Sequence, residues 1–102
     1  MSIQKQVGLK FKLNDPEFPK RNYKTYDRLK PAYSTIGVQS LIEENGFQEY
    51  THFILGQIIS KLVATTVKTK ELDYLQIVYL FDTKLYVIDD DSHITILLPE
   101  EY

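Results

Sequence analysis

The feature that most constrains the fold is residues 71–88, where two strongly apolar segments flank a short polar break. Residues 72–81 are almost all apolar or aromatic, and their β-branched and aromatic content favours a strand over a helix. Side chains alternate between the two faces of a strand, and both faces here are mostly apolar. Residues 82–84 supply the break, and residues 85–88 resume the strand. We predict a central hairpin, with a helix on one face and either the N-terminal segment or another protein on the other.

A third strand follows the hairpin and completes a C-terminal antiparallel meander over residues 72–98. Residues 89–92, Asp-Asp-Asp-Ser, predict the connecting turn, because Asp and Ser side chains bond readily to nearby backbone amides. Residues 93–98 form the predicted strand. Pro99 ends it, because proline has no amide hydrogen to donate to a neighbouring strand.

The segment before the hairpin predicts one main helix over about residues 47–63. Its apolar side chains make a broad stripe, which suits a helix packed across a sheet. The stripe contains Phe47, Tyr50, Ile54, Ile58 and Leu62. Asn45 and Gln48 match the spacing of an N-terminal capping box. Gly56 falls in the middle of this helix, where we expect it to allow close approach to a strand.

The N-terminal third is basic, and the remainder is acidic. Residues 1–34 carry eight Lys/Arg and three Asp/Glu, a net charge of +5, whereas residues 35–102 carry four and eleven, a net charge of −7.

Residues 7–13 alternate apolar residues with Gly and Lys, which predicts a half-buried strand at a sheet edge. Residues 33–42 are expected to hold a further short strand.

The predicted fold class is therefore α+β, with one main helix packed on an antiparallel sheet of about four strands. A chain of 102 residues suits a single domain. We divide it into a basic N-terminal segment, residues 1–34, and an α+β body, residues 35–102.

Composition excludes several classes of protein. The chain has no cysteine, so it can form neither a disulfide framework nor a thiolate metal site. No apolar run approaches the ~20 residues of a membrane-spanning helix, and the first residues lack the apolar centre of a signal peptide. We expect a cytoplasmic protein with no membrane partner.

The sequence shows no arrangement typical of catalysis. His52 and His93 are the only histidines, and the aspartates before His93 lack the spacing of a calcium-binding loop. The serines have no nucleophile motif around them, and the four glycines are too scattered to cradle a phosphate. We predict a protein that is not an enzyme and that needs no metal and no cofactor.

The basic segment suggests one binding function. Lysine and arginine neutralise phosphates and tyrosine rings stack on bases, and single-strand binding combines the two. The residues that would bind nucleic acid are Lys20, Arg21, Lys24, Arg28, Lys30, Tyr23 and Tyr26. The alternative is a solvated charged face whose tyrosines pack on the body.

The acidic body, residues 35–102, suggests a second binding function. A compact acidic surface can occupy a basic groove of a partner that normally holds nucleic acid. The residues predicted to contact such a protein partner are Asp89, Asp90, Asp91, Glu100, Glu101 and Tyr102. A homodimer is also allowed, because eight Tyr and five Phe can be buried between two copies as well as in one core.

Residues 71–77, Glu-Leu-Asp-Tyr-Leu-Gln-Ile, resemble the Leu-Asp-Tyr-Leu-Gln-Val-Phe strand of a domain family of unknown function. Phages, prophages and pathogenicity islands of staphylococci and related Gram-positive bacteria encode this family. In it a Thr-x-Gly-Val segment leads to an amphipathic helix and then to the strand, and the domain ends near a Pro and a Tyr. Residues 35–38, the helix, the strand, Pro99 and Tyr102 follow that order, so the resemblance covers residues 35–102.

The chain also departs from that pattern. Ile36 stands where the family usually has Arg, and residues 94–98 replace a segment that usually carries a His and a Gln-Glu pair. Residues 1–34 have no counterpart. The resemblance implies a small accessory protein of a mobile genetic element, located in a bacterial host cytosol, and no catalytic residues.

These observations lead to two hypotheses of function. In the first, a non-enzymatic, phage-like protein binds and modulates or inhibits a host or phage protein, with a defence nuclease as one candidate target, as for anti-CRISPR proteins. In the second, the chain is a nucleic-acid-binding accessory protein that uses the basic, Tyr-rich segment 20–33.

Overall fold

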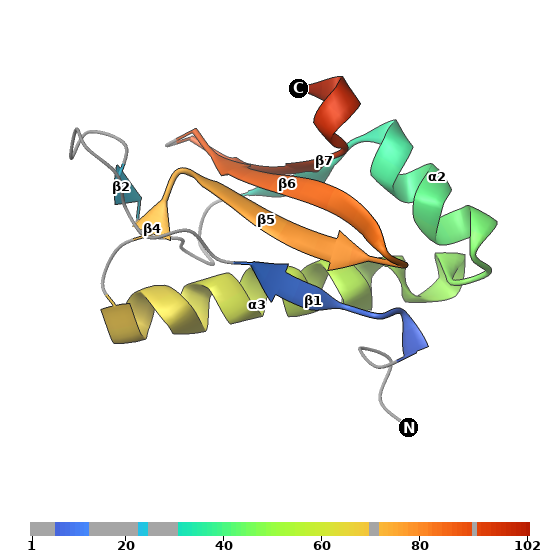
Figure 1. The fold of residues 1–102 in the computed structure, drawn as a ribbon, viewed down its shortest axis with the longest axis horizontal. Coiled ribbons are helices and arrows are strands. Elements are labelled where there is room, and N and C mark those ends of the chain that lie inside the picture. Colours follow the sequence, from blue (N-terminus) through green and yellow to red (C-terminus); the bar gives the residue numbers. More distant parts are fainter. Residues whose placement is uncertain (1–5, 13–22, 25–30, 70–71, 91) are drawn as a thin grey trace.

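The computed structural model describes residues 6–12, 23–24, 31–69, 72–90 and 92–102 and confirms the α+β prediction (Figure 1). Among these residues, the helices α2 and α3 pack on a five-stranded sheet. The elements in chain order are β1 (Lys10–Lys12), β2 (Tyr23–Lys24), β3 (Ala32–Ser34), α2 (Ile36–Glu44), the 3-10 helix η2 (Gln48–Tyr50), α3 (Thr51–Thr69), β4 (Leu72–Asp73), β5 (Leu75–Leu80), β6 (Thr83–Asp89), β7 (Ile94–Leu97) and the 3-10 helix η3 (Pro99–Glu101).

The strand order of the main sheet is β1-β5-β6-β7-β3. The meander β5-β6-β7 is antiparallel, as predicted, and β1 is the edge strand beside β5. The prediction of about four antiparallel strands is wrong, because β3 joins the other edge and runs parallel to β7. The short strands β2 and β4 form a separate antiparallel pair, so the first predicted strand is divided at Tyr74.

The turn of the hairpin lies one residue earlier than the predicted polar break. Leu80 pairs with Thr83, which leaves a two-residue loop of Phe81 and Asp82 with φ of 52° and 59°. Two consecutive positive φ values match the right-handed twist of the flanking strands. An aromatic residue is unusual there. Phe81 is held by its ring, 5.5 Å from that of Phe47, and by its amide, which donates to the Val7 carbonyl at 2.7 Å.

The core lies between the helices and one face of the sheet. Ile54, Ile58 and Leu62 of α3 are at most 1% exposed, which confirms the inner part of the predicted stripe. Tyr50 is 44% exposed because it belongs to η2, before α3 begins. The strand residues in the same cluster are Val78, Leu80, Leu85, Val87, Ile94 and Ile96. In the described part of the chain, no helix is both long and apolar enough to cross a membrane.

The second helix, α2, occupies most of the segment expected to hold a short strand. Thr35 begins it, because its hydroxyl accepts from the Val38 amide at 3.4 Å. Asn45 ends it, with its side-chain amide donating to the Leu41 carbonyl at 2.8 Å. The prediction that Asn45 caps the start of the main helix is therefore wrong. That helix, expected over about residues 47–63, is η2 followed by α3.

Gly56 does not have the predicted role. A Cβ built on it meets no atom within 4 Å, apart from its own helix backbone and chain neighbours. It is exposed, and so lies away from the strands that α3 covers. Close approach is required instead at Gly37, whose added Cβ would lie 2.7 Å from side-chain atoms of Glu101 and Leu98.

Candidate binding surface

The strand register defines a second face of the sheet, opposite the helices. Residues paired across antiparallel strands share a face, and side chains alternate along each strand. The face away from the core carries Lys10, Lys12, Tyr33, Leu75, Ile77, Tyr79, Lys84, Tyr86, Ile88, Thr95 and Leu97, which we call the outer face. Three of these eleven residues are lysines and none is Asp or Glu, so the charge of the outer face is positive although the whole chain is at −2.

Tyrosines lie at three of these positions. Tyr79 on β5 and Tyr86 on β6 are diagonal neighbours, because Tyr79 pairs with Lys84 and Ile77 pairs with Tyr86. Such neighbours are about 7–8 Å apart and are within reach of one another's long side chains. Both are half-buried. Tyr33 on the edge strand β3 is 58% exposed, and its ring contacts the His93 ring edge-on at 5.5 Å.

The lysines frame one of these rings. Tyr79 is paired with Lys10 on β1 and with Lys84 on β6, so a lysine stands on the strand at each side. Lys10 Nζ lies 4.0 Å from an Asp82 oxygen, but the two side chains are 72% and 90% exposed, so this ion pair is weak. Lys84 Nζ is 5.5 Å from the centre of the Tyr86 ring. Lys12 is exposed on the same edge strand.

The C-terminus packs onto this face through Tyr102. The Tyr102 ring meets the Tyr86 ring edge-on at 5.8 Å, and its hydroxyl lies 3.4 Å from that of Tyr74. Tyr102 is nevertheless 67% exposed, and Glu100 is exposed beside it. Two residues predicted to bind a protein partner thus border the outer face.

Glu101, by contrast, is engaged within the chain. Its carboxylate accepts hydrogen bonds from the Thr35 hydroxyl at 2.5 Å, the Leu98 amide at 2.9 Å and the Gly37 amide at 3.2 Å. These bonds, the one from Thr35 above all, lower the pKa of Glu101 below the ordinary value of a glutamate. The carboxylate also sits at the N-terminus of α2, where negative charge is favourable. This contact fixes the C-terminal turn to α2.

The two described aspartates of the predicted acidic turn differ in exposure. Asp89 is only 1% exposed and belongs to the core face of β6, where its amide donates to the Tyr74 carbonyl at 2.9 Å. Asp90 is exposed, and Asp91 lies outside the described residues.

Asp90, Ser92 and His93 bring together the three residue types of a nucleophilic triad. Ser92 Oγ lies 2.9 Å from His93 Nδ1, and His93 Nε2 lies 3.1 Å from Asp90. However, Ser92 Oγ also donates directly to Asp90 at 3.0 Å, and the amides of Ser92 and His93 donate to the same carboxylate at 3.2 and 3.0 Å. The His93 amide is the main reason that the pKa of Asp90 is lowered. These bonds describe an Asx turn that joins two strands.

The segment predicted to bind nucleic acid is mostly outside the described residues. This applies to Lys20, Arg21, Arg28, Lys30 and Tyr26. Tyr23 and Lys24 form β2, whose backbone pairs with β4. The structure thus leaves that prediction untested.

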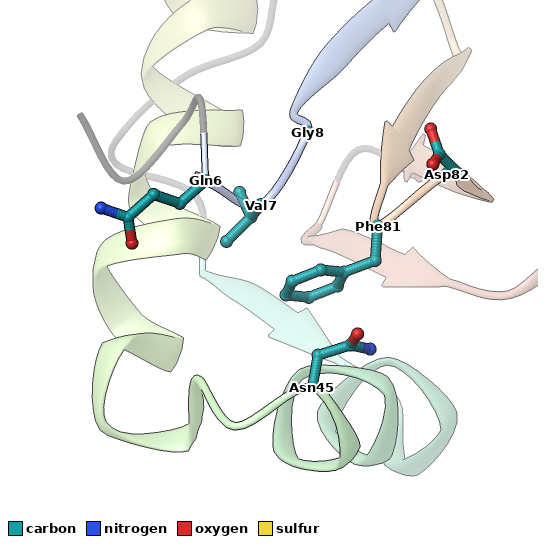
Figure 2. Close-up of a pocket in the computed structure, with 6 residues that line it drawn as sticks. All are labelled: Gln6, Val7, Gly8, Asn45, Phe81 and Asp82. Atoms are coloured by element: carbon teal, nitrogen blue, oxygen red, sulfur yellow. The ribbon is translucent and has the colours of Figure 1, made fainter. Parts of the chain in front are cut away.

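A shallow hollow of about 300 Å³ lies where residues 6–8 meet the hairpin turn. Figure 2 shows Phe81 and Asn45 on one side of it and Val7 on the other. Its lining residues are Gln6, Val7, Gly8, Asn45, Phe81 and Asp82. Two amide side chains and one highly exposed carboxylate do not form a convergent set of ligand-binding groups, so we assign no ligand to it.

Among the described residues, no group of three or more His, Cys, Asp or Glu side chains could hold a metal ion. Comparison with known proteins found no matching family model, no matching curated protein and no matching solved structure. The resemblance over residues 35–102 therefore stays a prediction.

Sequence reasoning identified Lys10 and Lys12 as edge-strand lysines but did not connect them with Tyr79 and Tyr86. The alternation of side chains was a usable signal within each strand, but it does not by itself place Tyr79 and Tyr86 on one face. The missing information was the register, which decides which strand lies beside which and thus which lysine flanks which ring.

Proposed function

We propose that this protein acts by binding rather than by catalysis, and that the outer face of the sheet is its binding surface. The observation that supports the proposal is the composition of that face, where half-buried Tyr79, Tyr86 and aliphatic side chains lie beside three lysines, and none of the eleven outer-face positions is Asp or Glu. Both helices pack on the opposite face, so neither α2 nor α3 covers these residues. A face of this kind is typical of an interaction site.

The resemblance favours a host protein as the partner, and a defence nuclease is the most specific candidate. Exposed Glu100 and Tyr102 border the outer face and are available to such a partner. Asp89 and Glu101 give it less support, because the first is buried and the second is engaged with Thr35.

Retention from a lysate tests the proposal. Immobilised protein is incubated with lysate of a Gram-positive bacterium, with and without nuclease, and retained protein and nucleic acid are both measured. Tyr79→Ala removes a ring from the outer face. Phe53→Ala removes a ring of α3 that is 50% exposed and serves as the matched control.

We expect a component that wild-type protein and Phe53→Ala both retain and that Tyr79→Ala loses. Circular dichroism verifies that both variants are folded. Equal retention by Tyr79→Ala and wild type would show that the outer face is not the binding surface.

A further inference from the structure

We infer that the outer face binds single-stranded nucleic acid, using Tyr79 and Tyr86 as stacking rings and Lys10, Lys12 and Lys84 as phosphate contacts. The inference rests on the proposed function, because it uses the same surface, and it assigns nucleic acid to that surface in place of the host protein that the resemblance favours. It does not use the basic segment 20–33.

The lysines of the outer face favour a phosphate backbone as the partner. Lys10 and Lys84 stand on the strands at either side of Tyr79, each about 4.8 Å from the β5 backbone. Lys12 follows Lys10 on the same side of β1, about 7 Å further along the strand. Lysines are depleted at the centres of protein interfaces, whereas a phosphate backbone requires them.

The tyrosine rings of the outer face favour bases that are not paired in a duplex. Bases that are free of a duplex stack on aromatic side chains displayed on a sheet, while flanking cations follow the backbone. Tyr79 and Tyr86 are diagonal neighbours on adjacent strands, about 7–8 Å apart. The Tyr102 ring packs edge-on against Tyr86 at 5.8 Å, so Tyr79 offers one stacking position and Tyr86, beside the Tyr102 ring, offers a second. Lys84 is an exposed residue, although its Nζ lies 5.5 Å from the centre of the Tyr86 ring.

The shape of the outer face favours a single strand over a duplex. A duplex hides the faces of its bases, and its major groove admits a helix or a two-stranded ribbon. The outer face is the surface of a broad sheet, which is too wide to enter the major groove of a duplex. It can instead hold unpaired bases against its aromatic side chains. The chemistry is shared by single-stranded DNA and RNA, and the experiment includes both.

The test is a binding titration by fluorescence anisotropy with labelled oligo-dT and oligo-U of about 15 nucleotides, together with a duplex of the same length. Neutralising three phosphates predicts that affinity falls roughly 20-fold between about 50 and 200 mM salt. Changing Lys10, Lys12 and Lys84 together to Gln should remove most of that salt dependence. Tyr79→Leu keeps an apolar side chain in place and should weaken binding roughly five- to hundredfold.

Lys61→Gln is the matched control for the lysines, because Lys61 is exposed on α3, which packs on the other side of the sheet. It should change affinity by less than about twofold. Lys12→Gln alone should reduce the slope of log affinity against log salt by about 0.7.

The inference is overturned if neither oligonucleotide binds at about 50 mM salt, if the duplex binds more tightly than the single strands, or if the triple lysine variant binds like wild type. Failure here is distinct from failure of the proposed function. A retained lysate component that depends on Tyr79 but is a protein and survives nuclease treatment would keep the binding surface and reject nucleic acid as its occupant.

Discussion

The carboxylate of Glu101 accepts a hydrogen bond from the backbone amide of Gly37, 64 residues earlier, at 3.2 Å. The absence of a side chain at Gly37 makes this contact possible, since a Cβ there would lie 2.7 Å from Glu101 Oε1. The same carboxylate accepts from Thr35, which begins α2. One C-terminal residue thus supplements the cap of a helix in the middle of the chain and holds the final turn beside the outer face.

Gly37→Ala should displace the Glu101 carboxylate with little change in overall stability. The new methyl group requires Glu101 or Leu98 to move, which disrupts the bonds to Thr35 and Gly37. Ala in place of Gly within a helix returns about 0.5–1 kcal/mol, which offsets that loss. We expect the pKa of Glu101, measured by NMR titration, to rise towards its ordinary value.

Gly56→Ala is the matched control, because it adds the same methyl group to open space in α3. It should leave the pKa of Glu101 unchanged and raise the free energy of unfolding by about 0.5–1 kcal/mol. If Gly37→Ala leaves the Glu101 pKa where it is in the wild type, the close approach of η3 to α2 is not as described.

Glu101 should also make stability depend on pH. Its folded-state pKa lies below that of the unfolded chain, chiefly because of the Thr35 hydroxyl. The contribution is therefore fully present above the ordinary pKa of a glutamate and is lost as pH falls through the lowered one. In Glu101→Gln this contribution is absent at every pH.

Urea unfolding of wild type and Glu101→Gln from pH 7 down to pH 3 measures the effect. The difference in unfolding free energy should be largest at neutral pH and shrink across the acidic range. The pKa of Asp90 is lowered as well, mainly by the His93 amide, but this residue is present in both proteins and cancels. A difference that grows on acidification would contradict the assignment.

The meander could be predicted from sequence because its signal is local. Apolar segments rich in β-branched and aromatic residues, separated by the polar residues 82–84 and 89–92, predict three consecutive strands, and α3 follows from its apolar stripe. The short strand expected within residues 33–42 overlaps β3 at Tyr33 and Ser34, but the parallel pairing of β3 with β7 could not be predicted, because β7 lies about 60 residues later. Helix α2 was missed because Ile36 and Val38 favour a strand locally, while the cap by Thr35 and its support from Glu101 depend on the fold.

The candidate site was predictable only in part, for a related reason. Residue types were enough to single out the lysines and tyrosines. The burial of Asp89 and the hydrogen bond from Thr35 to Glu101 depend on the tertiary structure. The turn at Phe81 shows the same limit. Its polar neighbours suggested a break at 82–84, whereas contacts with Val7 and Phe47 hold the aromatic residue itself in the loop.

Asp82→Gly should stabilise the protein by about 0.5–1 kcal/mol. Asp82 has a φ of 59°, which glycine adopts without steric cost, and glycine is preferred in such hairpin turns. The ion pair with Lys10 is lost, but it is exposed and contributes little. The midpoint of urea unfolding measures the gain.

Asp82→Asn separates backbone from charge, since asparagine tolerates positive φ and carries no charge. It should be close to neutral. If Asp82→Gly instead lowers the unfolding midpoint, Asp82 has a stabilising contact that outweighs the backbone gain.

The unpredicted helix α2 supplies two isoleucines of opposite burial. Ile42 is fully buried, and Ile36 is 80% exposed. Ile42→Ala leaves a cavity between α2 and the sheet and should lower the free energy of unfolding by about 2–5 kcal/mol. Ile36→Ala removes the same atoms from the surface and should change it by less than about 0.5 kcal/mol. Equal losses from the two substitutions, measured by urea unfolding, would contradict the orientation of α2 against the core.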